Sequence, residues 1–227
     1  MVEIYDHWWL KGENGDQEME ENHYLAWQNV IHLMDKKDIE KKKILDFGCN
    51  QGGFLRQLYD HIPYKNAYGI DLAKEAIEIA KQRAKMYPIT YAVGSNPAVF
   101  DCLFDTVIST SVLYLIEDLP EHFRLIGHVL REGGVYYTSF SDQTKNPSAT
   151  FMKEKIDRYG ATKMQIKSLN EVVDGLVAQG FSVELIKEQQ QPVYEVTSYK
   201  EFYLSVDDYL FSCDHSYLIK ARKGGRK

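Results

Sequence analysis

Short apolar runs alternate with amphipathic stretches along most of the chain. The runs have the length of buried strands and end at glycine or polar residues, whereas the stretches between them repeat apolar residues at helical spacing. This alternation predicts an α/β fold with a parallel sheet that is covered by helices on both faces. Strands are expected at 44–48, 67–71, 89–93, 106–109, 135–140, 181–186 and 216–221.

The predicted helices fall between these strands, and one precedes the first strand. Ser168 or Asn170 can cap the last helix, and Gly180 stops it. Between the sixth and seventh strands, 189–213 is an insertion that is dense in tyrosine and phenylalanine. Helices are expected at 20–36, 53–61, 73–86, 120–131, 149–159 and from 168 or 170 to 179.

Composition and charge limit the class of protein. The 227 residues fit one α/β domain, and the content of 44% hydrophobic and 26% charged residues is typical of globular proteins. The net charge of −6 disfavours polyanions, so we expect no DNA and no membrane as partner. No secretory signal or membrane-spanning run is found, which makes the cytoplasm the expected location. The cysteines form no CxxC pair and are expected to be reduced.

The chemically most informative stretch is Asp46-Phe47-Gly48-Cys49-Asn50-Gln51-Gly52-Gly53, where a predicted strand turns into a helix. Glycines at such a turn allow positive φ and close approach of a ligand to the backbone, and the N–H groups at the helix start attract negative charge. Asp71 ends the next strand, so we expect it at the same sheet edge, where a carboxylate suits the hydroxyls of a ribose.

This stretch resembles the first motif of the class I S-adenosylmethionine-dependent methyltransferases, acidic-x-Gly-x-Gly-x-Gly. Asp46, Gly48 and Gly52 match the motif, and Asn50 stands in place of its middle glycine. The runs 104–108 and 130–134 resemble the fourth-strand motif and the turn into the fifth strand of that family. The resemblance extends from about residue 24 to residue 223. It implies a Rossmann-like, seven-stranded, mostly parallel sheet whose last strand is antiparallel.

The resemblance also implies S-adenosylmethionine as cofactor and one methyltransferase domain over 1–227. Within it we expect an N-terminal lid and helix at 1–37, a cofactor-binding core at 38–141, and a C-terminal part at 142–227. Asp71 matches the ribose-binding acid, Leu72 takes the place of a residue that packs on adenine, and Ser95 or Asn96 meets the adenine. The expected cofactor-binding residues are Asp46, Gly48, Cys49, Asn50, Gly52, Asp71, Leu72, Ser95, Asn96 and Ser109.

The chemistry that follows is an in-line displacement from an activated donor, which requires positioning and exclusion of water more than a nucleophile. An acceptor that needs a base has two candidates, His7 and Tyr114, although an N-terminal histidine is usually exposed and a tyrosine in an apolar run usually belongs to the core. Serine and threonine follow the fourth strand, and these residues are poor sole ligands for magnesium, so no metal is expected.

Two aromatic regions are candidates for enclosing the substrate. Tyr5, Trp8 and Trp9 are expected to close over the donor as a lid, or else to pack on the sheet edge. The insertion 189–213, with Tyr203, is the candidate acceptor pocket, and its alternative is a dimer surface or plain core. We expect a monomer or a homodimer.

The favoured function is methylation of a small molecule. The sequence leaves open methylation of a protein or an RNA, and also a catalytically silent S-adenosylmethionine-binding protein. A dinucleotide-binding oxidoreductase is a further alternative, but as a GxGxxG fingerprint Gly48, Asn50 and Gly53 lack one glycine. The acid two residues before Gly48, together with Asp71, favours methyl transfer.

Overall fold

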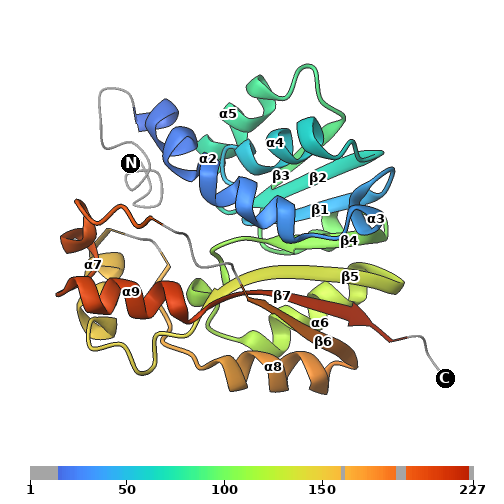
Figure 1. Ribbon diagram of the computed structural model, residues 1–227. Helices are drawn as coiled ribbons and strands as arrows, with labels where there is room; N and C mark the ends of the chain where they lie inside the picture. The colour runs from blue at the N-terminus through green and yellow to red at the C-terminus, as the bar shows by residue number, and fades with distance from the viewer. Residues whose placement is uncertain (1–14, 160–161, 188–192, 225–227) are drawn as a thin grey trace.

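The computed structural model describes residues 15–159, 162–187 and 193–224, and in these residues it contains one seven-stranded sheet of order β3-β2-β1-β4-β5-β7-β6 (Figure 1). β1 to β5 pair in parallel, and β7 is antiparallel to both of its neighbours, β5 and β6. The predicted fold class is therefore confirmed. The strands are β1 (Lys43–Phe47), β2 (Asn66–Asp71), β3 (Ile89–Val93), β4 (Phe104–Ser109), β5 (Leu130–Ser141), β6 (Phe181–Lys187) and β7 (Ser216–Lys223).

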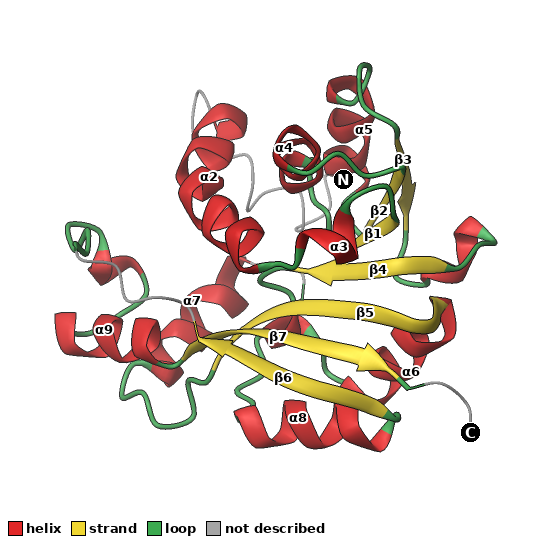
Figure 2. Cartoon of the chain, turned by 45° about the vertical axis from the view of Figure 1, so that its right-hand side comes forward, coloured by secondary structure: helices red, strands yellow, loops and turns green. Residues whose placement is uncertain are grey.

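Helices cover both faces of the sheet, as Figure 2 shows. One face packs against α2 (Gly15–Leu33), α4 (Gly53–His61) and α5 (Lys74–Arg83), and the other packs against α6 (Leu119–Val129) and α8 (Leu169–Ala178). The short α3 (Lys36–Ile39) leads into β1. The two remaining α-helices of the described residues, α7 (Ala149–Tyr159) and α9 (Val206–Asp214), lie together beyond one end of the strands (Figure 1). No helix in the described part of the chain is long and apolar enough to cross a membrane.

Most predicted elements are found, and the differences lie at their ends. The helices predicted at 53–61 and 149–159 and the strand predicted at 89–93 have the predicted bounds. The fifth strand begins at Leu130 instead of residue 135, because Leu130 already pairs with Phe104. The helix predicted to reach residue 131 therefore ends at Val129.

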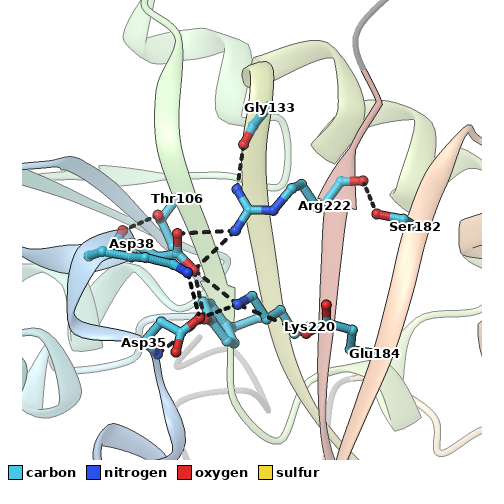
Figure 3. Close-up of polar contacts among 10 residues, drawn as sticks. Asp35, Asp38, Thr106, Gly133, Ser182, Glu184, Lys220 and Arg222 are labelled. Atoms are coloured by element: carbon cyan, nitrogen blue, oxygen red, sulfur yellow. Dashed lines mark hydrogen bonds and ion pairs between the residues drawn. The ribbon is translucent and has the colours of Figure 1, made fainter.

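A partly buried group of polar and charged side chains joins the segment between α2 and β1 to the last strand (Figure 3). The ammonium group of Lys220 lies 3.3 Å from the carboxylate of Asp38 and is also hydrogen-bonded to Asp35. Tyr137 donates a hydrogen bond of 2.9 Å to Asp38, and Arg222 approaches the same carboxylate at 3.2 Å. Burial is the largest single influence on the pKa of Lys220 and lowers it, but the hydrogen bond to Asp35 and the interactions with Tyr137 and Asp38 together outweigh burial, so the pKa lies above its usual value. We call Asp35, Asp38, Tyr137, Lys220 and Arg222 the β7 charge cluster.

Candidate active site at the carboxyl ends of the strands

The loop between β1 and α4 has an unusual backbone. Gly48, Asn50 and Gly52 all have positive φ, at 78°, 46° and 73°. Glycine takes this conformation without steric cost, and asparagine tolerates it better than most other residues. A Cβ on Gly48 would lie 2.6 Å from Val112, and a Cβ on Gly52 would lie 2.0 Å from the hydroxyl of Tyr91. Glycine at both positions is thus required by sterics as well as by φ.

Asp71 at the end of β2 holds this loop in place. One of its carboxylate oxygens accepts a hydrogen bond of 2.9 Å from the main-chain N–H of Asn50, and the other accepts one of 2.9 Å from Ala73. The main-chain N–H of Gly48 donates to the carbonyl of Ile70, also on β2. The loop after the first strand and the acid after the second strand therefore form one rigid unit at the carboxyl edge of the sheet.

Asp46 lies on β1 just below this unit. It is 2% exposed, and none of the described residues donates a hydrogen bond to its carboxylate. Burial, together with the nearby carboxylate of Asp71, raises the pKa of Asp46 to about 8. Burial raises the pKa of Asp71 as well. Two acids that are costly to ionise side by side form an environment that favours a cationic ligand.

Comparison with known proteins decides the family. A family model described as a methyltransferase domain matches residues 38–200, which is well over half of the chain. The chain belongs to the class I S-adenosylmethionine-dependent methyltransferases. The expected enzyme class and cofactor are thereby confirmed, and the oxidoreductase alternative is removed.

Relatives and solved structures agree with this assignment. The methyltransferase is 26% identical over 191 residues to a malonyl-[acyl-carrier protein] O-methyltransferase of Acetivibrio thermocellus, covering 77% of this chain and 67% of that one. The alignment with an enzyme of the same name from Bacillus cytotoxicus, at 27% identity, spans 45% of this chain but only 36% of that one. A methyltransferase of Haloferax volcanii, solved with the Trm112 methyltransferase activator, has a TM-score of 0.77 at 18% identity and 99% coverage of both chains.

The residues at the joined ends of β1 and β2 fit the cofactor of the methyltransferase chemically. S-adenosylmethionine carries a sulfonium cation, an amino-acid head and a ribose. The buried acids Asp46 and Asp71 are suited to the cation and to the ribose hydroxyls, and the N–H groups at the start of α4 are suited to a carboxylate. The carboxylate of Asp71 has further lone pairs beside the two that accept backbone N–H groups, so it can also accept hydrogen bonds from ribose hydroxyls.

The other predicted cofactor residues of the methyltransferase lie in different environments. Leu72 is half exposed beside Asp71, and the Cys49 side chain is buried within the loop. Ser95 and Asn96 are exposed after β3, and the side-chain oxygen of Asn96 caps the turn that follows by accepting from Ala98 at 3.0 Å.

Ser109, at the end of β4, is completely buried in the methyltransferase. Its hydroxyl is hydrogen-bonded to the hydroxyl of Tyr136 at 2.6 Å and donates to Thr138 at 3.0 Å. Tyr136 also contacts a ring nitrogen of His122 at 3.0 Å. Burial lowers the pKa of His122 to about 4, so the imidazole is neutral at pH 7. Ser109 thus belongs to a hydrogen-bonded chain under α6, an arrangement that its sequence position did not reveal.

Two of the predicted acceptor-side residues meet in a small apolar cluster. Tyr114 and Tyr203 both pack against Met152, Ile156 and Met164, where Met152 and Ile156 are on α7. Leu115 and Phe202 join them. We call these residues the α7 cluster. The methyltransferase therefore brings together Tyr114 and Tyr203, which are far apart in the sequence. His7, Tyr5, Trp8 and Trp9 lie outside the described residues.

A buried polar network that the sequence analysis missed supports the α7 cluster. The Ser148 hydroxyl donates a hydrogen bond of 2.5 Å to Asp208 and accepts one of 2.8 Å from the main chain of Leu204. The Tyr203 hydroxyl donates at 3.0 Å to Ser212 on α9. These contacts fix α9 and Tyr203 relative to the loop that follows β5. Scattered serines and acids carry no periodic signal, so the sequence offered no means of finding them.

Proposed function

We propose that this methyltransferase transfers the methyl group to a small-molecule acceptor bound between the loop after β1 and the α7 cluster. The observation that carries the proposal is the aromatic and methionine-rich α7 cluster. Its Met152 and Ile156 are on α7, which lies beyond one end of the strands (Figure 1). Small-molecule sites are concave, largely apolar and supplied with a few polar groups. The hydroxyls of Tyr114 and Tyr203 supply such polar groups.

On the donor side, we assign binding to Asp46, Gly48, Asn50, Gly52 and Asp71. S-adenosylmethionine, when bound, supplies a methyl group on a sulfonium that is already activated for displacement. The residues of this chain then have to bind the donor, align the acceptor with it and exclude water. Asp46 in its ionised form stabilises the positive charge, and Asp71 orients the ribose.

A carboxylate is our first candidate for the acceptor group. The relatives from Acetivibrio thermocellus and Bacillus cytotoxicus are named malonyl-[acyl-carrier protein] O-methyltransferases, and malonyl carries a free carboxylate. A carboxylate is ionised at pH 7 and attacks without a base. Tyr114 then orients the acceptor by hydrogen bonding. For a hydroxyl or amine acceptor, Tyr114 or His7 is the candidate base.

An acceptor screen tests this proposal. Methyl transfer from S-adenosylmethionine labelled on its methyl group would be measured with malonyl thioesters, with a panel of small carboxylic, phenolic and amine acceptors, and with bulk protein and RNA. We expect label in a small molecule, and a reduced kcat/KM for that acceptor in Tyr114→Phe with unchanged donor affinity. Label that appears only in polypeptide side chains or RNA, and in neither a free acceptor nor the malonyl group of a thioester, would contradict the proposal. Donor binding without transfer to any acceptor would favour a silent binding protein.

A further inference from the structure

The loop after β1 is also held from its far side, through Gln51. This residue is 2% exposed, although its side chain is polar. Its side-chain oxygen accepts a hydrogen bond of 2.9 Å from the guanidinium of Arg83, at the end of α5. Its main-chain carbonyl accepts one of 2.8 Å from the guanidinium of Arg56, on α4. We call Gln51, Arg56 and Arg83 the Gln51 cluster.

The backbone of the loop explains why such support matters. Its φ angle is positive at positions 48, 50 and 52, and at position 50 asparagine stands where the family motif has glycine. A non-glycine residue in the left-handed conformation is strained, so the loop keeps this shape only if its surroundings hold it. Asp71 holds Asn50 from the side of β2. Arg56 on α4 and Arg83 on α5 hold Gln51, the residue that follows Asn50.

Both contacts of Gln51 are charge-assisted hydrogen bonds to a buried acceptor. Bonds of this type are stronger than neutral ones, and the loss of one partner leaves a buried polar group unsatisfied. The contact with Arg83 joins residues 32 positions apart, so it links the loop to a helix that belongs to the next βα unit. Neither arginine is needed at its position for helix formation alone, because lysine or glutamine has a similar helix propensity.

We propose that Gln51 is a positioning residue for donor binding, and that Arg83 acts through it. The Gln51 cluster fixes the main-chain N–H groups and the φ angles of residues 48–52, so that the loop is already shaped for S-adenosylmethionine before the donor arrives. Loss of the cluster lets the loop relax, and binding of the donor then has to order it again. The inference concerns the donor and does not depend on which acceptor is used.

Affinity for S-adenosylmethionine and S-adenosylhomocysteine, measured by calorimetry beside the Tm of each variant, tests this proposal. Gln51→Leu and Arg83→Leu are each expected to weaken both ligands about tenfold, and the double variant is expected to be no weaker than either single one, because both remove the same contact. Gln51→Glu keeps an oxygen acceptor for Arg83 and should bind within about threefold of wild type. Lys81→Met, which removes an exposed ion pair with Glu78 on α5, is the matched control and should bind as wild type does.

Ligand affinity that stays within twofold of wild type in Gln51→Leu and Arg83→Leu would overturn the proposal. If the Tm of these variants fell while their affinity stayed unchanged, the cluster would serve stability alone, and the proposal would be overturned as well. Equal losses in the two single variants that add up in the double variant would also overturn it, since Arg83 would then act independently of Gln51. Should a leucine variant fail to fold, Arg83→Gln removes the guanidinium while keeping a polar side chain, and the same tenfold loss is expected.

Discussion

The main-chain N–H of Asn50 donates a hydrogen bond of 2.9 Å to the carboxylate of Asp71, which joins the loop after β1 to the end of β2. The residue that replaces the middle glycine of the family motif is thus held directly by the acid that we assign to the ribose. Donor binding and loop shape therefore depend on the same carboxylate. Substitutions in the loop, in Asp46 or Asp71, and in the residues that support the fold should therefore change stability and donor affinity to different extents.

Gly52→Ala is expected to destabilise the fold by about 2 kcal/mol and to weaken donor binding, because its Cβ would lie 2.0 Å from the Tyr91 hydroxyl and its φ is 73°. Urea unfolding measures the first effect and calorimetry the second. Tyr91→Phe removes the hydroxyl, so the double variant should recover part of the stability. No recovery in the double variant would show that the hydroxyl contact is not the source of the loss, which would then come from strain at φ and from the ring carbon of residue 91, 2.7 Å from the added Cβ.

Asp46 gives the protein without donor a specific pH dependence. The pKa of Asp46 is raised to about 8 in the folded protein from an ordinary value of 3.8, so the folded state binds this proton more tightly than the unfolded state does. The resulting stability is fully present below about pH 4 and is lost as the pH rises through about 8. Asp46→Asn has no carboxyl group at this position, so its stability does not fall with rising pH for this reason. The Tm of wild type minus that of Asp46→Asn should therefore fall between pH 5 and pH 8, roughly the interval between the two pKa values, and then level off.

The same carboxyl should make donor binding release a proton. At pH 7 Asp46 is mostly protonated in the free protein, and a cationic donor favours its ionised form. Calorimetry of S-adenosylmethionine binding in buffers of different ionisation enthalpy should show proton release near pH 7 in wild type and less in Asp46→Asn. A Tm difference that does not change with pH, or equal proton release in the two proteins, would contradict this account of Asp46.

Ser148→Ala should cost about 2 kcal/mol of stability. Ser148 is completely buried, and its hydroxyl satisfies both the Asp208 carboxylate and the main-chain N–H of Leu204. Urea unfolding measures the loss, and donor affinity should stay unchanged because the network supports the α7 cluster, where we propose that the acceptor binds. The control is Ser182→Ala. The hydroxyl of Ser182 makes one exposed contact of 3.4 Å, so its loss should change stability by less than about 0.5 kcal/mol. A loss of donor affinity in Ser148→Ala would contradict this separation.

Lys220→Met should destabilise the protein by about 3 kcal/mol, because it leaves the buried carboxylate of Asp38 without its ammonium partner. The exposed pair of Lys37 with Asp35 supplies the control, and Lys37→Met should change the free energy of unfolding by less than about 0.5 kcal/mol. Equal effects of the two substitutions would show that Arg222 and Tyr137 are sufficient to hold Asp38.

The sequence was sufficient to predict the strands, the covering helices and the loop at 48–52, because period, glycine and acid positions are local signals. The contacts that support the site and the sheet through long-range packing were out of reach. Gln51 with Arg83, Ser148 with Asp208, and Lys220 with Asp35 are 32, 60 and 185 positions apart, and each is set by how elements pack. Ser109 shows the same limit, since its position at a strand end predicted exposure to ligand whereas its hydroxyl is used within the core.

The central claim is that the donor binds at the joined ends of β1 and β2, and calorimetry of S-adenosylmethionine with wild type, Asp71→Asn and Asp71→Ala tests it most directly. Wild type should bind, Asp71→Asn should bind at least about tenfold more weakly because it loses the charge, and Asp71→Ala should lose more because the loop contact to Asn50 is also lost. Equal affinity in all three proteins would contradict the claim, since the donor would then lie away from this acid.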